Sequence, residues 1–587
     1  MTRPGWQLSF GATLVAPDRT RFRIWAPAQQ KMTVAIEGGP AVAMTRGDGG
    51  WFETEADAGA GALYRYVLPD GTTIPDPAAR AQADDVHGAS VVVDPASYRW
   101  RYPQWRGRPW REAVIYELHV GMLGGFAGTA RVLPRLADLG ITAVELMPIA
   151  EFPGARNWGY DGVLPFAPEC SYGSPDELKA LVDAAHQHNL MIFLDVVYNH
   201  FGPDGNYLPI CAPQMFRGDL ATPWGPAIDF RRQEVRRFFT DNALYWLIEY
   251  RFDGLRFDAV HAIPEPDWLD EMAAEVRRRL EPDREVHLVL ENDDNAARHL
   301  AGDFDAQWND DGHHVLHVLL TGEREGYYGD YADEPAVRLA RCLKEGFVYQ
   351  GEPSPHRAGK RRGTPSADLP PTAFVLFLQN HDQIGNRAFG ERLTTLTEPA
   401  ALEAAIALQL LCPQIPLLFM GEEQASPTPF LFFTDHNQDL ARAVRDGRRK
   451  EFAGFSQFSD PLLLEKIPDP NAIDTFDRSK PAPDGTRGTD RERLYRRLLA
   501  LRRAEIVPRL EGAHAIEARA VGPAAVLARW RMGDGATLTI ASNLGTTAAE
   551  IPRQKARLLF ATSRDAEHAA QAGLIAPHST IVVLEPE

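Results

Sequence analysis

Short apolar segments alternate with amphipathic ones through the middle of the chain. Eight segments of six to ten residues are rich in Val, Ile, Leu and Phe, a composition typical of buried strands. They cover residues 113–120, 141–149, 190–199, 252–260, 287–292, 304–309, 373–380 and 415–423. Several are followed by helical patterns, such as residues 174–189, which open with Ser174-Pro175, a pair typical of a helix start. Eight such units predict an α/β fold, a (β/α)8 TIM barrel with loop insertions, whose last helix covers residues 494–510.

The two ends of the chain have a different pattern, with apolar and polar residues in strict alternation. Near the start, residues 20–27, 32–38, 51–56 and 63–74 read as strands, and Asp70-Gly71 marks a hairpin turn. Near the end, residues 524–545 alternate around a Gly-Asp-Gly turn, and residues 579–586 form another strand pattern. We therefore expect an N-terminal β-sandwich over 1–105, the barrel over 106–512 and a small C-terminal β domain over 513–587.

Composition and charge narrow the class of partner. The chain of 587 residues has 62 Lys and Arg against 80 Asp and Glu, a formal net charge of −18, which argues against nucleic acid as a partner. No segment approaches eighteen uninterrupted apolar residues, and the first fifteen residues have no signal-peptide core, so we expect no membrane association. The four cysteines lie far apart, at Cys170, Cys211, Cys342 and Cys412, and this favours a reducing, cytoplasmic location.

Polar side chains gather where the predicted strands end. In a TIM barrel the carboxyl ends of the strands form one rim, and the chemistry is located there. The residues at these ends are Asp195, Asn199, His200, Arg256, Asp258, Glu291, His381 and Asp382. Arg256 and Asp258 are notable because they lie on the same face of a strand that is otherwise apolar. Several ionisable groups that meet at one rim indicate an active site.

Two of the carboxylates have the environments that glycoside hydrolysis requires. This reaction needs one ionised carboxylate and one protonated carboxylic acid on either side of the scissile bond. The neighbouring guanidinium of Arg256 would keep Asp258 ionised. Glu291 follows the apolar run HLVL, where burial would raise its pKa and keep a proton for the leaving group. Asp382 is a third acid that could bind the hydroxyl groups of a distorted sugar ring.

Four motifs carry a resemblance to a known family. DVVYNH (195–200), GLRFDAV (254–260), LEN (290–292) and NHD (380–382) resemble, in this order, the four signatures of the α-amylase glycoside hydrolase family. The resemblance covers essentially the whole chain, and FRIWAP (22–27) is similar to the N-terminal module of branching and debranching members. It implies a retaining enzyme in which Asp258 is the nucleophile, Glu291 the acid/base and Asp382 the transition-state stabiliser. It also implies that Arg256 binds the nucleophile and that the sugar is bound by Tyr160, Asp195, Asn199, His200 and His381.

Longer similarities favour one group within this family. VHAI, FDAQWNDDGHHVLH, FLQNHDQIGNRAFGERL and FLFFTDH resemble members that cleave the α-1,4 bond next to the trehalose end of maltooligosyltrehalose. This implies maltooligosyltrehalose and maltooligosaccharides as ligands, and a pathway shared with a maltooligosyltrehalose synthase. One alternative is an α-1,6-acting debranching or branching enzyme, although Glu291-Asn292 departs from the Glu-Glu pair of branching enzymes. Another is an inactive glycan-binding subunit, which the intact trio of acids argues against.

Aromatic residues on the predicted rim loops are candidates for recognition of the trehalose end. Sugars pack their apolar faces on aromatic rings, and the rim loops offer Trp224, Tyr327 and Tyr328. His261 matches a position that contacts the leaving sugar in the family the chain resembles.

The remaining motifs give less indication of function. His313 and His317 are spaced like metal ligands, but packing at a helix start is the better interpretation because no HExxH glutamate is present. Asn199 resembles a calcium-binding position of many amylases, but no cluster of oxygen ligands surrounds it in the sequence. We predict catalysis without metal or cofactor. We read residues 351–371, which are rich in Pro, Gly and basic residues, as a solvated barrel loop rather than a basic binding patch.

Overall fold

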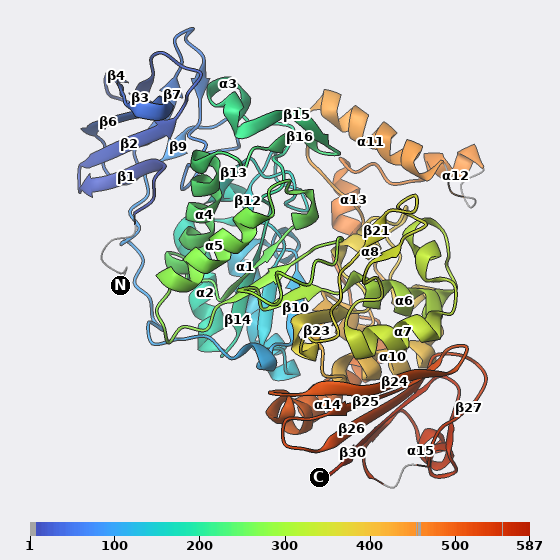
Figure 1. Ribbon diagram of the computed structural model, residues 1–587. Helices are drawn as coiled ribbons and strands as arrows, with labels where there is room; N and C mark the ends of the chain where they lie inside the picture. The colour runs from blue at the N-terminus through green and yellow to red at the C-terminus, as the bar shows by residue number, and fades with distance from the viewer. Residues whose placement is uncertain (1–6, 454, 456–459, 554–555) are drawn as a thin grey trace.

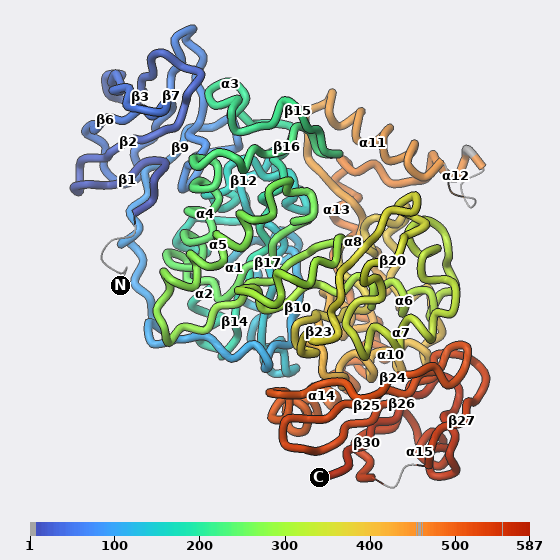
Figure 2. Tube along the Cα trace, in the orientation of Figure 1, coloured from blue at the N-terminus to red at the C-terminus, as the bar shows by residue number. Residues whose placement is uncertain are grey.

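The computed structural model describes residues 7–453, 455, 460–553 and 556–587. Residues 1–6, the start of the segment tested above for a signal peptide, lie outside this part. The chain runs from an N-terminal pair of sheets through a barrel to a C-terminal sheet, and Figures 1 and 2 show the barrel between the two β regions. No helix among the described residues combines the length and the apolar character that a membrane crossing needs.

The centre of the molecule is a closed barrel of eight parallel strands. The strands are β10 (Ile115–Leu118), β11 (Ala143–Leu146), β14 (Met191–Val196), β17 (Gly254–Phe257), β18 (His287–Leu290), β19 (Ala306–Trp308), β22 (Phe374–Phe377) and β23 (Ile415–Phe419). Each lies inside one of the eight predicted segments, so the TIM barrel is confirmed. Apolar side chains, among them Ile115, Phe193 and Phe377, fill the barrel interior.

Helices cover the outside of the barrel. They are α1 (Gly125–Leu139), α2 (Pro175–Gln187), α4 (Gln233–Ile248), α5 (Asp267–Arg279), α6 (Asp310–Thr321), α7 (Pro335–Glu345), α10 (Pro399–Leu411) and α14 (Gly485–Leu501). The predicted start of α2 is confirmed, since the Ser174 and Glu177 side chains form a reciprocal capping box with the backbone. The last barrel helix is confirmed too, although α14 ends at Leu501 and a π turn, Arg502–Ile506, follows it. Residues 291–305, between β18 and β19, contain no helix.

Two antiparallel sheets form the N-terminal β region. One has the order β1 (Gly11–Ala16), β2 (Arg19–Trp25), β6 (Trp51–Asp57), β5 (Thr45–Arg46). The other contains β4 (Val42–Ala43), β3 (Thr33–Ile36), β7 (Leu63–Val67), β8 (Thr73–Ile74) and β9 (Ser90–Val91). The turn at Asp70-Gly71 is confirmed, because Gly71 has a φ of +87° and β7 pairs antiparallel with β8. Phe22, Phe52 and Tyr64 are buried in the core of this region.

The C-terminal region is a five-stranded sheet with a short helix. Its order is β24 (His514–Gly522), β25 (Ala525–Arg531), β26 (Thr537–Asn543), β30 (Ser579–Glu585), β28 (Arg557–Ala561). The predicted Gly-Asp-Gly turn joins β25 to β26, and Gly535 has the positive φ that it requires. In Figure 1 this sheet packs below the barrel, next to α10 and α14.

Two excursions extend from the carboxyl ends of the barrel strands. The first, after β14, carries the hairpin β15 (Phe216–Thr222) and β16 (Gly225–Ile228). The second, after β23, carries α11 (Gln438–Phe452), α12 (Pro461–Glu465) and α13 (Ile473–Arg478). Figure 1 shows both on the same side of the barrel.

The interpretation of residues 351–371 as a solvated loop holds for the largely exposed residues 355–361 but is wrong for Arg362. β20 (Glu352–Pro353) and β21 (Arg361–Arg362) form a hairpin there, and Arg362 is buried. The Arg362 guanidinium lies 2.9 Å from Asp311 and 2.9 Å from Asp293, and Arg357 also pairs with Asp293. Sequence alone could not show this, because the acidic partners come from distant parts of the chain.

Candidate active site

Arg256 binds several carboxyl groups of the polar rim. It is the inward-facing residue of β17, fully buried, and its guanidinium lies 4.1 Å from the centre of the Trp308 ring. Its Nη1 donates to both oxygens of Asp195, at 2.9 and 2.8 Å, and to Asp258 at 2.9 Å. Its Nη2 donates to Glu291 at 2.7 Å. One cation therefore holds three carboxyl groups from three successive barrel strands.

Asp258 follows the end of β17 and is held in its ionised form. Burial opposes ionisation, but Arg256 outweighs it together with His200 and the Asn199 amide, so the pKa of Asp258 lies below its usual value. The Asn199 Nδ2 donates to Asp258 Oδ2 at 2.8 Å and to its backbone carbonyl at 2.8 Å. Asp258 is thus a fixed anion with one oxygen on Arg256 and the other on Asn199.

Glu291, directly after β18, is held in the opposite state. Burial raises its pKa well above the usual value, the negative charges of Asp258 and Asp382 add to this, and Arg256 opposes it only in part. Its Oε2 also accepts a hydrogen bond from the Ala259 amide at 2.8 Å. Ala259 has a φ of +40°, a strained value for a residue with a Cβ, and this turn directs its N–H at Glu291. Two carboxyl groups on one guanidinium therefore differ in protonation.

Asp382 and His381 approach from β22, at the start of a short helix, α8 (His381–Gly385). The Asn380 side chain caps this helix and accepts the Asp382 N–H at 2.9 Å. The Asp382 side chain is 39% exposed, the most open of the three acids. His381 pairs through Nδ1 with Glu117; burial lowers its pKa, but Glu117 and Asp382 outweigh this and raise it to about 9.

Tyr160 contacts both Asp195 of β14 and His381 of α8. Its hydroxyl donates to Asp195 at 2.6 Å, and its ring stacks on His381 with 5.0 Å between centroids. Both ring nitrogens of His200 lie within hydrogen-bond distance of protein oxygens, those of Asn199 and the Tyr160 backbone. The structure therefore brings together all the predicted strand-end residues.

Two predicted sugar-binding residues are buried beneath the rim. Asp195 and Asn199 are 2% and 1% exposed, and their side chains are occupied by Arg256, Tyr160 and Asp258. These contacts hold Arg256 and Asp258 in place. The sequence could not show this burial, because an open and a buried polar residue look alike at a strand end.

The predicted aromatic residues of the rim differ in exposure. Tyr328 is buried, stacks on His317 at 4.2 Å between centroids, and lies 3.2 Å from His313 through its hydroxyl. It packs loop Gly326–Tyr331 onto α6, and His317 covers one face of its ring. Tyr327 remains partly open, with 37% of its surface exposed.

The other candidates for recognition of the trehalose end contact different parts of the rim. Trp224, at the tip of the β15–β16 hairpin, is 47% exposed and stacks on His200 with 5.1 Å between centroids. His261 Nδ1 accepts the Asp293 N–H at 3.3 Å, beyond Glu291. Tyr327 faces the charges of Asp382 and Asp310. Trp224, His261 and Tyr327 thus have different neighbours at the rim.

Two carboxyl groups of the site were missed in the sequence. Glu117 and Glu145 are paired in the β10–β11 register and are both fully buried. Glu117 binds His381, whereas neither oxygen of Glu145 has a hydrogen-bond partner among the described residues. Burial, followed by the charge of Glu117, raises the pKa of Glu145 well above its usual value. The signal used for Arg256, an ionisable residue within an otherwise apolar strand, would have found both in IYEL and AVEL.

The histidines of α6 are structural, as predicted. His313 Nδ1 lies 2.7 Å from the Leu378 carbonyl, and His317 Nε2 lies 2.7 Å from Glu323. In the described part of the chain, Glu151, Glu169 and Cys170 form a group with metal-ligand spacing. Their oxygens accept hydrogen bonds from the Cys170, Phe152 and Ser171 amides, so this group serves to fix the local loop.

Comparison with known proteins identifies the family. The model "Alpha amylase, catalytic domain" matches residues 79–209, and "Domain of unknown function (DUF3459)" matches residues 513–583. The malto-oligosyltrehalose trehalohydrolase of Deinococcus radiodurans is 43% identical over 500 residues, 83% of this chain and 82% of the relative. That of Saccharolobus solfataricus is 40% identical over 484 residues, 79% of this chain and 84% of the relative.

The chain belongs to the malto-oligosyltrehalose trehalohydrolase family. It is a glycosidase of the α-amylase type. A crystal structure from Salmonella typhimurium, provisionally described as an alpha amylase, has 44% sequence identity and a TM-score of 0.92, covering 99% of this chain and 100% of that one. The structural likeness to that protein thus extends over the barrel and both β regions.

Proposed function

We propose that this glycosidase cleaves the α-1,4-glucosidic bond next to the trehalose end of maltooligosyltrehalose and releases trehalose and a maltooligosaccharide. The observation that carries the chemistry is the pair of carboxyl groups on Arg256, one ionised and one protonated. The choice of substrate is supported by the relatives that match most of the chain, which bear the trehalohydrolase name.

We assign the roles of a retaining double displacement. Asp258 attacks the anomeric carbon while Glu291 gives its proton to the leaving oxygen, so the trehalose unit departs with a neutral hydroxyl. Glu291, now ionised, then takes a proton from water as the water attacks the glycosyl-enzyme bond and frees Asp258. Asp382, the most exposed acid, binds hydroxyl groups of the distorted ring.

Trehalose and maltose have the same charge and composition, so shape and stacking must distinguish them on the leaving-group side. Trp224 and Tyr327 are the exposed aromatic residues of the rim that remain available for this, and His261 adds a polar contact beyond Glu291. Tyr328 is left out of this set because it is buried against His317.

The wider setting of the protein is also a proposal. Its ligands would be maltooligosyltrehalose and maltooligosaccharides, supplied by a maltooligosyltrehalose synthase in the cytoplasm. The unpaired state of all four cysteines agrees with a reducing compartment. The domain boundaries 1–105, 106–512 and 513–587 are proposals too. The change from sheet to barrel between β9 and β10 supports the first of these boundaries.

Product analysis tests the proposal. Maltotriosyltrehalose, maltopentaose and an α-1,6-branched dextrin are incubated in parallel with the enzyme. We expect maltotriosyltrehalose to give maltotriose and trehalose far faster than maltopentaose is cleaved. Equal rates on both linear substrates, or a preference for the dextrin, would show that the substrate is wrong.

Variants test the chemistry separately. Asp258→Asn and Glu291→Gln should each lower kcat by several orders of magnitude on every substrate while the fold survives, since each removes one half of the acid pair. Asp253→Asn is the matched control: it removes a buried carboxylate at the other end of β17, where Asp253 binds His186 and Trp105. It should lower Tm but keep kcat.

A further inference from the structure

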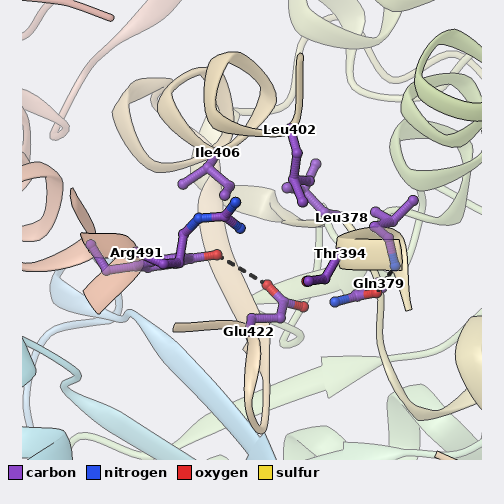
Figure 3. Close-up of a pocket in the computed structure, with 9 residues that line it drawn as sticks. Leu378, Gln379, Thr394, Leu402, Ile406, Glu422 and Arg491 are labelled. Carbon is purple, nitrogen blue, oxygen red and sulfur yellow. Dashed lines mark hydrogen bonds between the residues drawn. The ribbon is translucent and has the colours of Figure 1, made fainter. Parts of the chain in front are cut away.

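A small cavity lies outside the barrel wall, behind the strand that carries Asp382. It is enclosed by segments around β22, β23, α10 and α14, and Figure 3 shows side chains from these elements around it. Its volume of about 10 Å³ leaves space for one water-sized occupant. Leu402 and Ile406 close its apolar side, and Gln379, Thr394, Glu422 and Arg491 line its polar side.

Arg491 of α14 is the unusual member of this lining. It is 97% buried (3% exposed), its Nε has no acceptor, and its guanidinium forms no hydrogen bond or ion pair within the described residues. Two nearby buried arginines behave differently. Arg392 donates to the Thr428 and Met420 carbonyls at 2.7 and 2.8 Å, and Arg502 donates to three carbonyls at 2.7 to 3.1 Å.

The nearest acids do not supply a counter-charge. Burial raises the pKa of Glu422 to about 8, so it is mainly protonated at neutral pH; it interacts with the Tyr495 hydroxyl at 3.3 Å. Glu423 is already paired with Arg135 at 2.6 Å and with the Tyr116 hydroxyl. A buried guanidinium without an ionised partner is costly, which favours uptake of a charge from solution.

We propose that this cavity binds one small monovalent anion, of the size of chloride, as the counter-ion of Arg491. The guanidinium supplies free N–H donors, and the Thr394 hydroxyl and the Gln379 amide lie on the same lining. The volume excludes phosphate and sugars. Gln379 accepts the Leu393 N–H at 3.0 Å and precedes Asn380, His381 and Asp382, so the anion would stabilise this strand end from behind.

Thermal unfolding tests the proposal at constant ionic strength and neutral pH. Chloride replaces gluconate, which is too large to enter. We expect the Tm of the wild-type protein to rise saturably with chloride, as binding to the folded state requires. Arg491→Met should lose the saturable rise. Arg502→Met, the matched control, removes a buried arginine that already has acceptors and should keep it.

The same Tm in chloride and gluconate for the wild-type protein would overturn the proposal, as would a saturable rise that survives in Arg491→Met. If that variant does not fold, wild-type crystals soaked in bromide decide the question. An anomalous peak beside Arg491 supports the site, and its absence from an otherwise ordered cavity refutes it.

Ionisation of Glu422 gives an independent readout. As the pH rises through about 8, Glu422 becomes an internal counter-ion, and the anion response of the wild-type protein should fade. Glu422→Gln should retain the response above that pH, and a response that fades equally in both proteins would contradict the assignment. The pKa of Tyr495 responds to the charges of Glu422, Arg491 and Glu423, and that of Arg392 responds to Glu422 and Glu423.

Discussion

Arg256→Lys is the perturbation that tests the architecture of the site most directly. The guanidinium makes four hydrogen bonds to three carboxyl groups through two nitrogens that face different partners. A lysine ammonium keeps the positive charge but is a single point, so it cannot serve the Nη1 and Nη2 partners together. At least two charge-assisted hydrogen bonds are lost, each worth about 1.5–3 kcal/mol.

The loss in activity follows from these hydrogen bonds. If about 3–4 kcal/mol of the lost interaction is expressed in the transition state, kcat/KM falls by about 10²–10³-fold at 1.36 kcal/mol per factor of ten. The pH profile should change as well. Arg256 is the main group that keeps the pKa of Asp258 low, so in the variant this pKa rises and the acid limb moves to higher pH.

The assay is kcat/KM on maltotriosyltrehalose across the pH range, with Tm measured on the same samples. Arg502→Lys is the matched control, because Arg502 is equally buried but binds only backbone carbonyls near the C-terminal sheet. It should lower Tm and leave the pH profile in place. A kcat/KM within about tenfold of wild type for Arg256→Lys, less than 1.4 kcal/mol, together with an unmoved acid limb, would refute the reasoning.

Three further predictions concern neighbouring groups. Glu145→Gln should keep most of the activity at neutral pH, because burial already holds this carboxyl uncharged. Asp195→Asn should lower the activity about tenfold or more, because its hydrogen bond to the Arg256 guanidinium is weakened. Similar losses of activity in both variants would show that Glu145 is ionised. Trp224→Ala and Tyr327→Ala should each lower the ratio of kcat/KM on maltooligosyltrehalose to kcat/KM on maltooligosaccharide, by the equivalent of about 0.5–1.5 kcal/mol. Tyr328→Phe is the control and should leave this ratio unchanged. An unchanged ratio in both alanine variants would place the trehalose pocket elsewhere. Dialysis against a chelator should leave activity and Tm unchanged, and a large loss of either would reveal a metal site.

The sequence alone determined the barrel and the polar residues at the ends of its strands. A parallel strand that is buried on both faces is mostly apolar, so each of the eight strands is visible as a short apolar run. A polar residue at the end of such a run can only lie at the rim, and this placed Asp258, Glu291 and Asp382 together before any contact was known. Hairpin turns such as Asp70-Gly71 were equally visible, because positive φ values restrict the residues that fit.

Only the tertiary structure decided which polar residues remain open at the rim and which hold others in place. Asp195 and Tyr328 have the residue types expected of a sugar site, yet burial gives the first to Arg256 and the second to His317. Arg362 lies in a segment that reads as solvated, but its partners Asp293 and Asp311 reach it only in the folded chain. Burial and pairing depend on residues far apart in sequence, and they set the pKa that divides a nucleophile from an acid.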